Sequence, residues 1–221
     1  RTHGRPIPPE TDAWRLVTFS QNHDQIGNRA AGDRLTAQLS EARLAIAAVL
    51  TVLSPSTPML FMREEWAAST PWPFFSSHPE PELAAAVEAG RIEEFARMGW
   101  NPDDIARPQD PATFAAAHLD WSELAAPLHA RMLERYRTLI ALRRREPALH
   151  SPRFTELSGS WSDEARTIAL ERGDITIRVN FGTEPWRAAA AEKVLFTTTD
   201  TDPIAEGRLA LPPDSAVVSR R

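Results

Sequence analysis

The chain has 221 residues, of which 42% are apolar and 25% are charged. This length and composition allow a buried hydrophobic core, so a disordered protein is not expected. The formal net charge of -5 disfavours nucleic acid and anionic membranes as partners, because binding to either needs a basic surface. The sequence contains no cysteine, which excludes disulfides and thiolate metal sites and is compatible with a cytoplasmic location.

The N-terminal residues 1–12 are polar and rich in proline, which predicts a loop. They contain no apolar stretch of the kind found in signal peptides. The longest apolar stretch, residues 44–53, is far shorter than the roughly 20 residues that a membrane-spanning helix needs. We therefore expect neither a secretion signal nor contact with a membrane.

Two short apolar runs in the first third of the chain each end in polar residues. Residues 14–19 are rich in strand formers and are followed by the polar residues 20–25. Ser40 can cap an apolar helix that ends near residue 53, and a second apolar run, residues 59–62, opens into charged residues. This order predicts a βαβ unit, in which ligands bind at the carboxyl ends of the strands.

The rest of the chain divides into a helical part and a part rich in short strands. A helix is predicted from Pro81 to about residue 98, and a longer one over residues 123–145 with its basic end in solvent. Beyond residue 150 the sequence predicts a small antiparallel sheet domain. Its expected strands are residues 154–157, 167–170, 175–180, 194–198 and 216–219. We therefore expect two domains, residues 1–150 and 151–221.

The polar cluster after the first run carries a resemblance to a known family. Residues 19–29, with Asn22, His23, Asp24 and Gln25 at their centre, resemble the fourth sequence region of the amylase superfamily of glycoside hydrolases. Three further stretches are similar to the trehalohydrolase branch of that superfamily: residues 54–66, 70–75 and 95–111. The resemblance covers the whole chain. It implies an α/β fold with the last two βα units of a (β/α)8 barrel, followed by a small antiparallel β-sandwich.

The resemblance also implies roles for individual residues. Asp24 is similar to the third carboxylate of the superfamily, which binds the sugar in the cleavage subsite as the ring flattens toward the transition state. His23 is expected to bind the hydroxyls of the same sugar. No cofactor and no metal are expected, because one His beside one Asp provides too few ligands. The other expected substrate-binding residues are Asn22, Gln25, Glu64, Trp66 and Trp72.

The nucleophile and the acid/base carboxylate of a retaining glycosidase have no matching motif in this chain. In the superfamily they come from the fourth and fifth strands, ahead of the region where this chain starts. The chain is therefore expected to be only a portion of a retaining hydrolase. The resemblance alone implies the reaction of the whole enzyme, which is cleavage of the α-1,4 bond next to the trehalose end of a malto-oligosaccharide with release of trehalose. The alternative is an inactive fragment or a carbohydrate-binding module. Expected partners are that substrate and either the missing N-terminal barrel portion or a second copy.

Simpler structural roles compete with these interpretations. Asn22 and Asp24 can satisfy backbone groups at a turn, and the aromatic residues can anchor a loop. Glu64 and Glu65 are a second candidate for the missing pair, but neighbouring residues on a strand point to opposite faces and do not easily converge on one bond. We expect instead that one lies near the substrate and the other forms a salt bridge in the wall. Arg63 stands where the family usually has glycine, which permits either a positive φ angle or a close approach of the backbone, so we expect Arg63 to strain this strand end.

Overall fold

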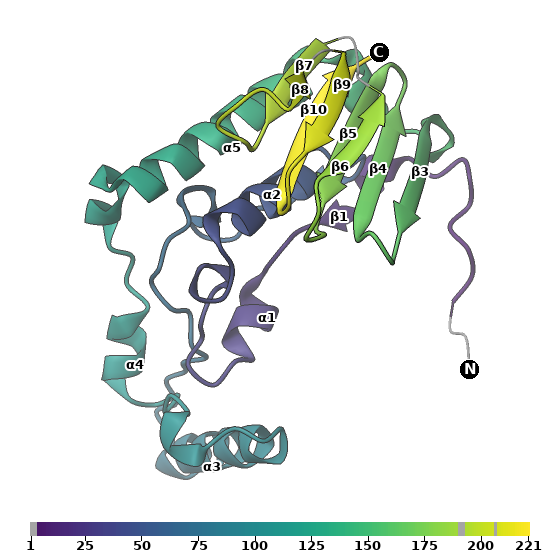
Figure 1. The fold of residues 1–221 in the computed structure, drawn as a ribbon. Coiled ribbons are helices and arrows are strands. Elements are labelled where there is room, and N and C mark those ends of the chain that lie inside the picture. The colour runs from purple at the N-terminus through teal and green to yellow at the C-terminus, as the bar shows by residue number, and fades with distance from the viewer. Residues whose placement is uncertain (1–3, 190–192, 206) are drawn as a thin grey trace. The chain divides into compact units, whose positions relative to one another are not determined.

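The computed structural model describes residues 4–189, 193–205 and 207–221 (Figure 1). The chain forms two compact units, each assembled from segments that are distant in the sequence. The first comprises Arg1–Ser20, Ser40–Met59 and Arg131–Arg221, and the second comprises Gln21–Leu39 and Leu60–Ala130. These units follow packing rather than chain order, and the expected domain boundary near residue 150 stays a prediction.

A βαβ arrangement lies in the first unit, as predicted. Strands β1 (Val17–Thr18) and β2 (Thr57–Pro58) pair in parallel, and helix α2 (Glu41–Val52) connects them. The predicted strands were too long, and the second was placed too late. Strand β2 ends at Pro58, which is the last residue that pairs with β1, and the predicted run could not continue through Met62, whose φ of 22° does not fit an extended strand.

Helix α2 forms where the sequence predicts it, because the capping residue and the buried apolar side chains both favour a helix over these residues. The Ser40 side chain accepts a hydrogen bond from the backbone N–H of Arg43, 3.3 Å away. The apolar side of the helix is buried, and α2 packs against strand β10 (Ser215–Arg220). The helix thereby fixes the βαβ part of this unit to its sheet.

Helix α5 (Pro127–Arg145) starts later than predicted, because Ala126 is extended and Pro127 can open a helix. The basic C-terminal end of α5 was predicted to lie in solvent, and this prediction was wrong for Arg143. The half-buried Arg143 guanidinium donates hydrogen bonds to the carbonyls of Val52, Ser54 and Ser56. The arginine thus satisfies the backbone groups left open at the end of α2.

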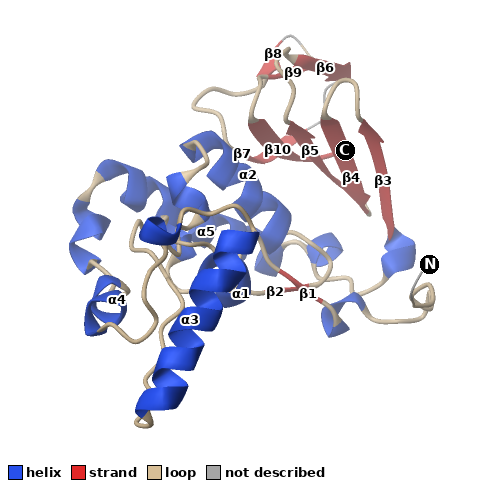
Figure 2. Ribbon diagram, turned by 90° about the horizontal axis from the view of Figure 1, so that it is seen from below, coloured by secondary structure: helices blue, strands red, loops and turns tan. Residues whose placement is uncertain are grey.

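The C-terminal part of the first unit holds two antiparallel sheets, which confirms the predicted sheet domain (Figure 2). The five-stranded sheet has the order β3-β4-β5-β10-β7, and the three-stranded sheet has the order β6-β9-β8. The strands are β3 (Leu157–Ser162), β4 (Thr167–Arg172), β5 (Ile175–Asn180), β6 (Trp186–Ala189), β7 (Lys193–Thr197), β8 (Ile204–Ala205) and β9 (Arg208–Leu211). The first predicted strand was misplaced, because Phe154–Glu156 form a 3-10 turn ahead of β3.

The centre of the five-stranded sheet forms the core of this part. Directly paired residues share a face of a sheet, and Ile177 of β5 lies opposite Val218 of β10. Both are buried, as are their neighbours Val179 and Ala216 on the same face. Burial of such apolar side chains supplies the main driving force for folding.

Glu41, at the first turn of α2, forms ion pairs with two arginines of α5. Its carboxylate lies 2.7 Å from Arg131 and 2.5 Å from Arg135. The hydrogen bond from Arg131 is the main cause that lowers the pKa of Glu41 from 4.5 to about 2, with Arg135 acting in the same direction and burial against it. The charged form of Glu41 therefore stabilises the folded state.

We expect replacement of Glu41 by glutamine to destabilise the chain by up to about 3 kcal/mol at pH 7. The folded-state pKa lies below the unfolded value, so this stability is present above pH 4.5 and is lost as the pH falls toward 2. Urea unfolding of both proteins at several pH values measures it. A gap between wild type and Glu41→Gln that stays constant from pH 7 to pH 2 would contradict the assignment.

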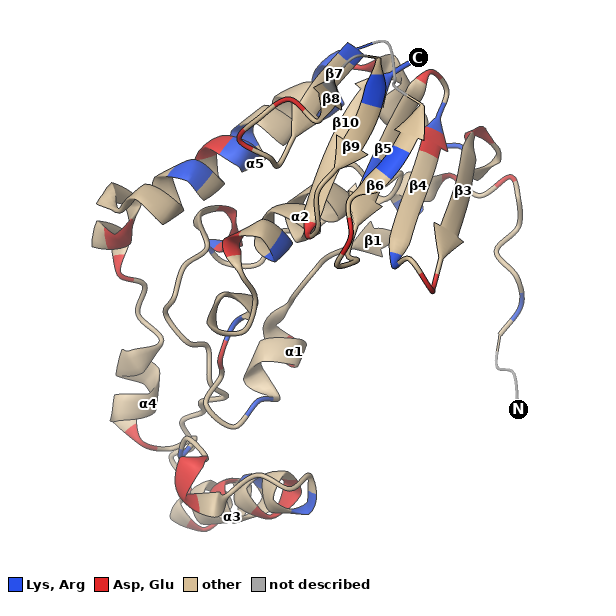
Figure 3. Ribbon diagram, in the orientation of Figure 1, with Lys and Arg blue, Asp and Glu red and all other residues tan. Residues whose placement is uncertain are grey.

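The second unit contains helices α1 (His23–Gly27), α3 (Pro81–Arg97) and α4 (Pro111–Ala116). Pro81 occupies the first turn of α3, as predicted. Acidic and basic residues lie along this helix (Figure 3), and Phe95 is its buried residue, packed in a cluster with Ala30 and Ile105. None of the helices in the described part of the chain has the length and apolar character needed to span a membrane.

Candidate functional site

The polar cluster predicted to bind sugar begins with a helix cap. The side-chain oxygen of Asn22 accepts hydrogen bonds from the backbone N–H groups of Asp24 (2.9 Å) and Gln25 (3.1 Å). The Gln25 side chain in turn accepts one from the Asn22 backbone N–H at 2.8 Å. The two residues form a capping box at the start of α1. Their side-chain oxygens thus hold the backbone that carries His23 and Asp24. This is a structural role, and it is the alternative to sugar binding for these two side chains.

Between these two capping residues, His23 and Asp24 project into solvent. Their side chains are 68% and 70% exposed, and the Nε2 atom of His23 lies 3.1 Å from the Oδ1 atom of Asp24. Arg91 of α3 holds the other end of α1 by donating hydrogen bonds to the Gly27 carbonyl and the Asn28 side chain. The carboxylate and the imidazole are therefore accessible groups on a backbone fixed at both ends.

Glu64 is in a different environment from Asp24. Its side chain is buried, and its Oε2 atom accepts a hydrogen bond from the Phe61 backbone N–H at 3.2 Å. The positive charge nearby is Arg34, a buried arginine that donates to the carbonyls of Met62 and Thr70. Burial lowers the pKa of the Arg34 guanidinium and attraction to Glu64 opposes that shift. Glu64 therefore helps to hold the loop in shape and does not present a carboxylate to solvent.

Trp66 and Trp72 also differ in burial. Trp66 is buried and packs edge-on against Trp121, with ring centroids 4.9 Å apart. An indole in this position supports the loop, as in the anchoring role weighed above. Trp72 is half-buried and contacts Phe61 and Phe75 edge-on, at 5.9 and 5.2 Å. Of the two predicted platforms, only Trp72 retains exposed ring surface.

The loop after α1 holds the Trp72 segment in place. Gly32 has a φ of 63°, and a Cβ atom there would lie 2.1 Å from the Pro73 nitrogen, so only glycine fits. The Gly32 carbonyl accepts a hydrogen bond from the Trp72 N–H at 2.7 Å. The structure thus connects the α1 segment with the Trp72 segment, and Phe61 connects Trp72 with the Glu64 loop.

Arg63 has a φ of 69°, so the structure shows the first of the two reasons for a glycine at this position, a positive φ angle. Its guanidinium lies 4.3 Å from the ring centre of Trp121 and 5.1 Å from that of Trp66, and it pairs with Glu65 at 3.5 Å. Cation–π contacts of this kind contribute roughly 0.5–1 kcal/mol each. These contacts offset the backbone strain of a left-handed residue, which is about 1–2 kcal/mol.

Two substitutions of Arg63 distinguish the effect of backbone strain from the effect of the cation–π contacts. We expect Arg63→Ala to destabilise the chain by about 1 kcal/mol, because it keeps the left-handed backbone and removes both ring contacts. Arg63→Gly also removes the contacts but relieves the strain, so it should be more stable than Arg63→Ala by about 1 kcal/mol. Thermal unfolding of the two variants side by side measures the difference. Equal stabilities would mean that the positive φ carries no strain.

Sequence reasoning missed Arg34 and Arg91, which determine the shape of this region. Arg34 lies in polar, irregular sequence and Arg91 lies on the predicted helix that begins at Pro81, and at either place an arginine is normally solvent-exposed. Burial of a single arginine produces no recurring pattern in the sequence, so the roles of Arg34 and Arg91 become visible only in the folded structure. Among the residues that the structure describes, no group of three or more His, Asp or Glu is arranged to hold a metal ion.

Comparisons with protein families and with solved structures identify the class of fold. Residues 152–218 match the family model of a domain of unknown function, DUF3459. The structure aligns with that of a Salmonella typhimurium protein provisionally named an alpha amylase, with a TM-score of 0.79 and 29% identity, over 96% of this chain and 36% of that one. The fold is therefore that of a C-terminal part of an alpha-amylase family enzyme.

Two curated relatives narrow the assignment. The chain is 50% identical over 220 residues to malto-oligosyltrehalose trehalohydrolase from Brevibacterium helvolum, and 49% identical over 222 residues to that from Rhizobium sp. strain M-11. It spans 37% of the length of each. The chain therefore corresponds to a C-terminal portion of a protein of the malto-oligosyltrehalose trehalohydrolase group. Both steps of the resemblance seen in the sequence are confirmed.

Proposed function

We propose that this chain is the part of a retaining glycoside hydrolase that holds the transition-state carboxylate, Asp24, and part of the sugar-binding wall. The substrate of the whole protein is a malto-oligosaccharide with a trehalose end, and the product is trehalose. The observation that carries the proposal is the exposed Asp24 carboxylate on a backbone fixed by the capping box. A carboxylate held before the reaction begins can stabilise developing charge without reorganisation.

In this proposal Asn22 and Gln25 act as positioning residues, and Asp24 and His23 contact the sugar. Trp72, on a segment hydrogen-bonded to the loop after α1, offers an aromatic surface for sugar, while Glu64 and Trp66 support the loop from within. A retaining mechanism also needs a nucleophile and an acid/base about 5 Å apart. These come from the remaining barrel portion, which is the partner that we propose for this chain, acting in the cytoplasm. The alternative is a carbohydrate-binding fragment without catalysis, which needs only side chains accessible to a sugar, such as Asp24, His23 and Trp72.

A chimera tests the proposal. The chain replaces the corresponding part of the Brevibacterium helvolum relative, which is 50% identical to it, and trehalose release from malto-oligosyltrehalose is measured. We expect release by the chimera and a loss of about 10²–10³-fold when Asp24 is changed to asparagine, which keeps the shape but removes the charge. Asp163→Asn, at a solvent-exposed site in the sheet part, is the matched control and should not change the rate.

Two outcomes count against the proposal. Full activity of the Asp24→Asn chimera would remove Asp24 from the chemistry. Trehalose release by the isolated chain, abolished by Asp24→Asn, would show that it carries the complete catalytic set and would overturn its role as a portion.

A further inference from the structure

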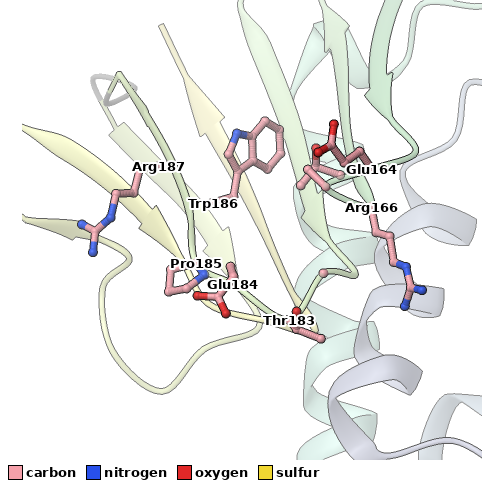
Figure 4. A pocket seen from close by; sticks show the side chains of 10 residues that line it. Glu164, Arg166, Thr183, Glu184, Pro185, Trp186 and Arg187 are labelled. Atoms are coloured by element: carbon pink, nitrogen blue, oxygen red, sulfur yellow. The ribbon is translucent and has the colours of Figure 1, made fainter.

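A cleft of about 400 Å3 lies in the sheet part of the first unit, between the β3–β4 turn and the segment that leads into β6 (Figure 4). None of its lining residues belongs to the candidate site around Asp24. A volume in this range is typical of small-molecule sites. Glu164 and Arg166 come from the turn, and Thr183, Glu184 and Trp186 come from the segment before and within β6.

The walls of the cleft are fixed by buried contacts. The side chain of Asn180, which is fully buried, accepts a hydrogen bond from the Gly182 N–H and donates one to the Glu184 carbonyl, both at 2.9 Å. Gly182 lies so close to the turn that a Cβ atom there would be 2.5 Å from the Ala165 carbonyl oxygen. The Phe181 N–H donates to the Arg166 carbonyl at 2.8 Å. The cleft is therefore formed in advance of any ligand.

Trp186 provides an aromatic surface inside this cleft. It packs against the buried cluster of Leu209, Leu211 and Val217, yet remains half-exposed. Figure 4 shows its indole projecting toward the turn that carries Glu164 and Arg166. An aromatic ring anchored on one side can present its other side to an apolar surface of a ligand.

The charged side chains of the cleft have no partners within the described part of the chain. Glu164, Glu184, Arg166 and Arg187 take part in no ion pair or side-chain hydrogen bond there, although arginines and carboxylates are paired over much of the surface. Figure 4 shows Arg187 projecting away from Trp186 and the turn, and the cleft itself carries charges of both signs from Glu164, Glu184 and Arg166. It offers many donors and acceptors to a neutral, hydroxyl-rich molecule.

We propose that this cleft binds a neutral oligosaccharide, stacked on Trp186 and hydrogen-bonded by Glu164, Arg166 and Glu184. A pyranose ring has an apolar face and a rim of hydroxyl groups, which match the indole and the charged groups respectively. The site goes beyond the proposed function, because it lies outside the Asp24 region. Only the choice of an α-1,4-glucan as the probe rests on that function.

Calorimetric titration of the whole chain with maltohexaose tests the proposal. We expect binding by the wild type and at least about tenfold weaker binding by the Arg166→Ala/Glu184→Ala double variant, because it loses charged hydrogen bonds. Trp186→Ala should weaken binding similarly. Trp161→Ala, which removes a 73% exposed tryptophan on β3 outside the cleft, should bind as the wild type does.

Trp186→Ala can unfold the sheet part, and in that case the double variant decides, because both of its side chains are exposed. Absence of maltohexaose binding by the wild type would overturn the proposal. So would unchanged binding by the folded double variant. Binding lost in Asp24→Ala and kept in the double variant would place the sugar at the candidate site, which refutes the cleft and supports the proposed function.

Discussion

Replacing Arg34 by methionine should destabilise the chain by about 3–5 kcal/mol. The guanidinium is 1% exposed and donates from Nη1 to the Met62 carbonyl at 2.8 Å and from Nε to the Thr70 carbonyl. Methionine fills much of the same volume but leaves these carbonyls without their donor. It also leaves the buried Glu64 carboxylate without the attraction of this positive charge.

Urea unfolding measures this loss, provided that the slope of free energy against urea stays unchanged. Arg29→Met is the matched control, because Arg29 pairs with Asp33 at 2.8 Å on a partly exposed surface. That substitution should change stability by no more than about 1 kcal/mol.

A double-variant cycle identifies the cause. If Glu64 and Arg34 stabilise each other, Arg34→Met combined with Glu64→Gln should lose less than the sum of the two single variants. Strict additivity would show that Arg34 acts only through its carbonyl contacts. Similar small losses for Arg34→Met and Arg29→Met would contradict the buried role of Arg34.

The helices of this fold could be predicted from sequence because their signals are local. Ser40 precedes α2 and Pro81 opens α3, so each helix start depends on residues next to it. The short strands were harder to place. Strand β1 consists of the two residues that pair with β2, so its limits depend on a segment about 40 positions away in the chain.

The candidate site shows a similar division. The cluster at residues 22–25 was recognised from its residue types and their order, but the same oxygens serve either to bind a sugar or to cap a helix. The structure gives the capping role to Asn22 and Gln25 and leaves Asp24 and His23 exposed. From residue type alone, Trp66 and Trp72 were equally good candidates for stacking on a sugar. Their different burial follows from packing against Trp121, which no local pattern indicates.

Buried polar residues are the features that sequence predicts least, and Asn180 is the clearest example. It ends β5, where an asparagine is normally a turn residue in solvent, yet it is fully buried. Its amide nitrogen donates to the carbonyls of Glu184 and Leu211 at 2.9 Å and of Pro212 at 3.0 Å. With the Gly182 N–H that its amide oxygen accepts, this one side chain connects four backbone groups from the segment after β5 and from the end of β9.

Replacing Asn180 by alanine should therefore destabilise the chain by about 2–4 kcal/mol, because several buried backbone groups lose their partner at once. Asn180→Asp should be at least as harmful, since a carboxylate cannot donate to the three carbonyls. Asn101→Ala, at an exposed cap 3.2 Å from the Asp103 N–H, is the control, with an expected loss of about 0.5–1 kcal/mol. Thermal and urea unfolding of the four proteins measure these differences.

The same substitution should affect the sugar cleft, because Asn180 holds both Gly182 and the Glu184 backbone. At a temperature where Asn180→Ala is still folded, maltohexaose binding should weaken although no residue that contacts the sugar has changed. The reason is that a loosened wall must be ordered on binding, which reduces affinity. If Asn180→Ala lost stability but bound maltohexaose like the wild type, the rigidity of this wall would contribute nothing to recognition.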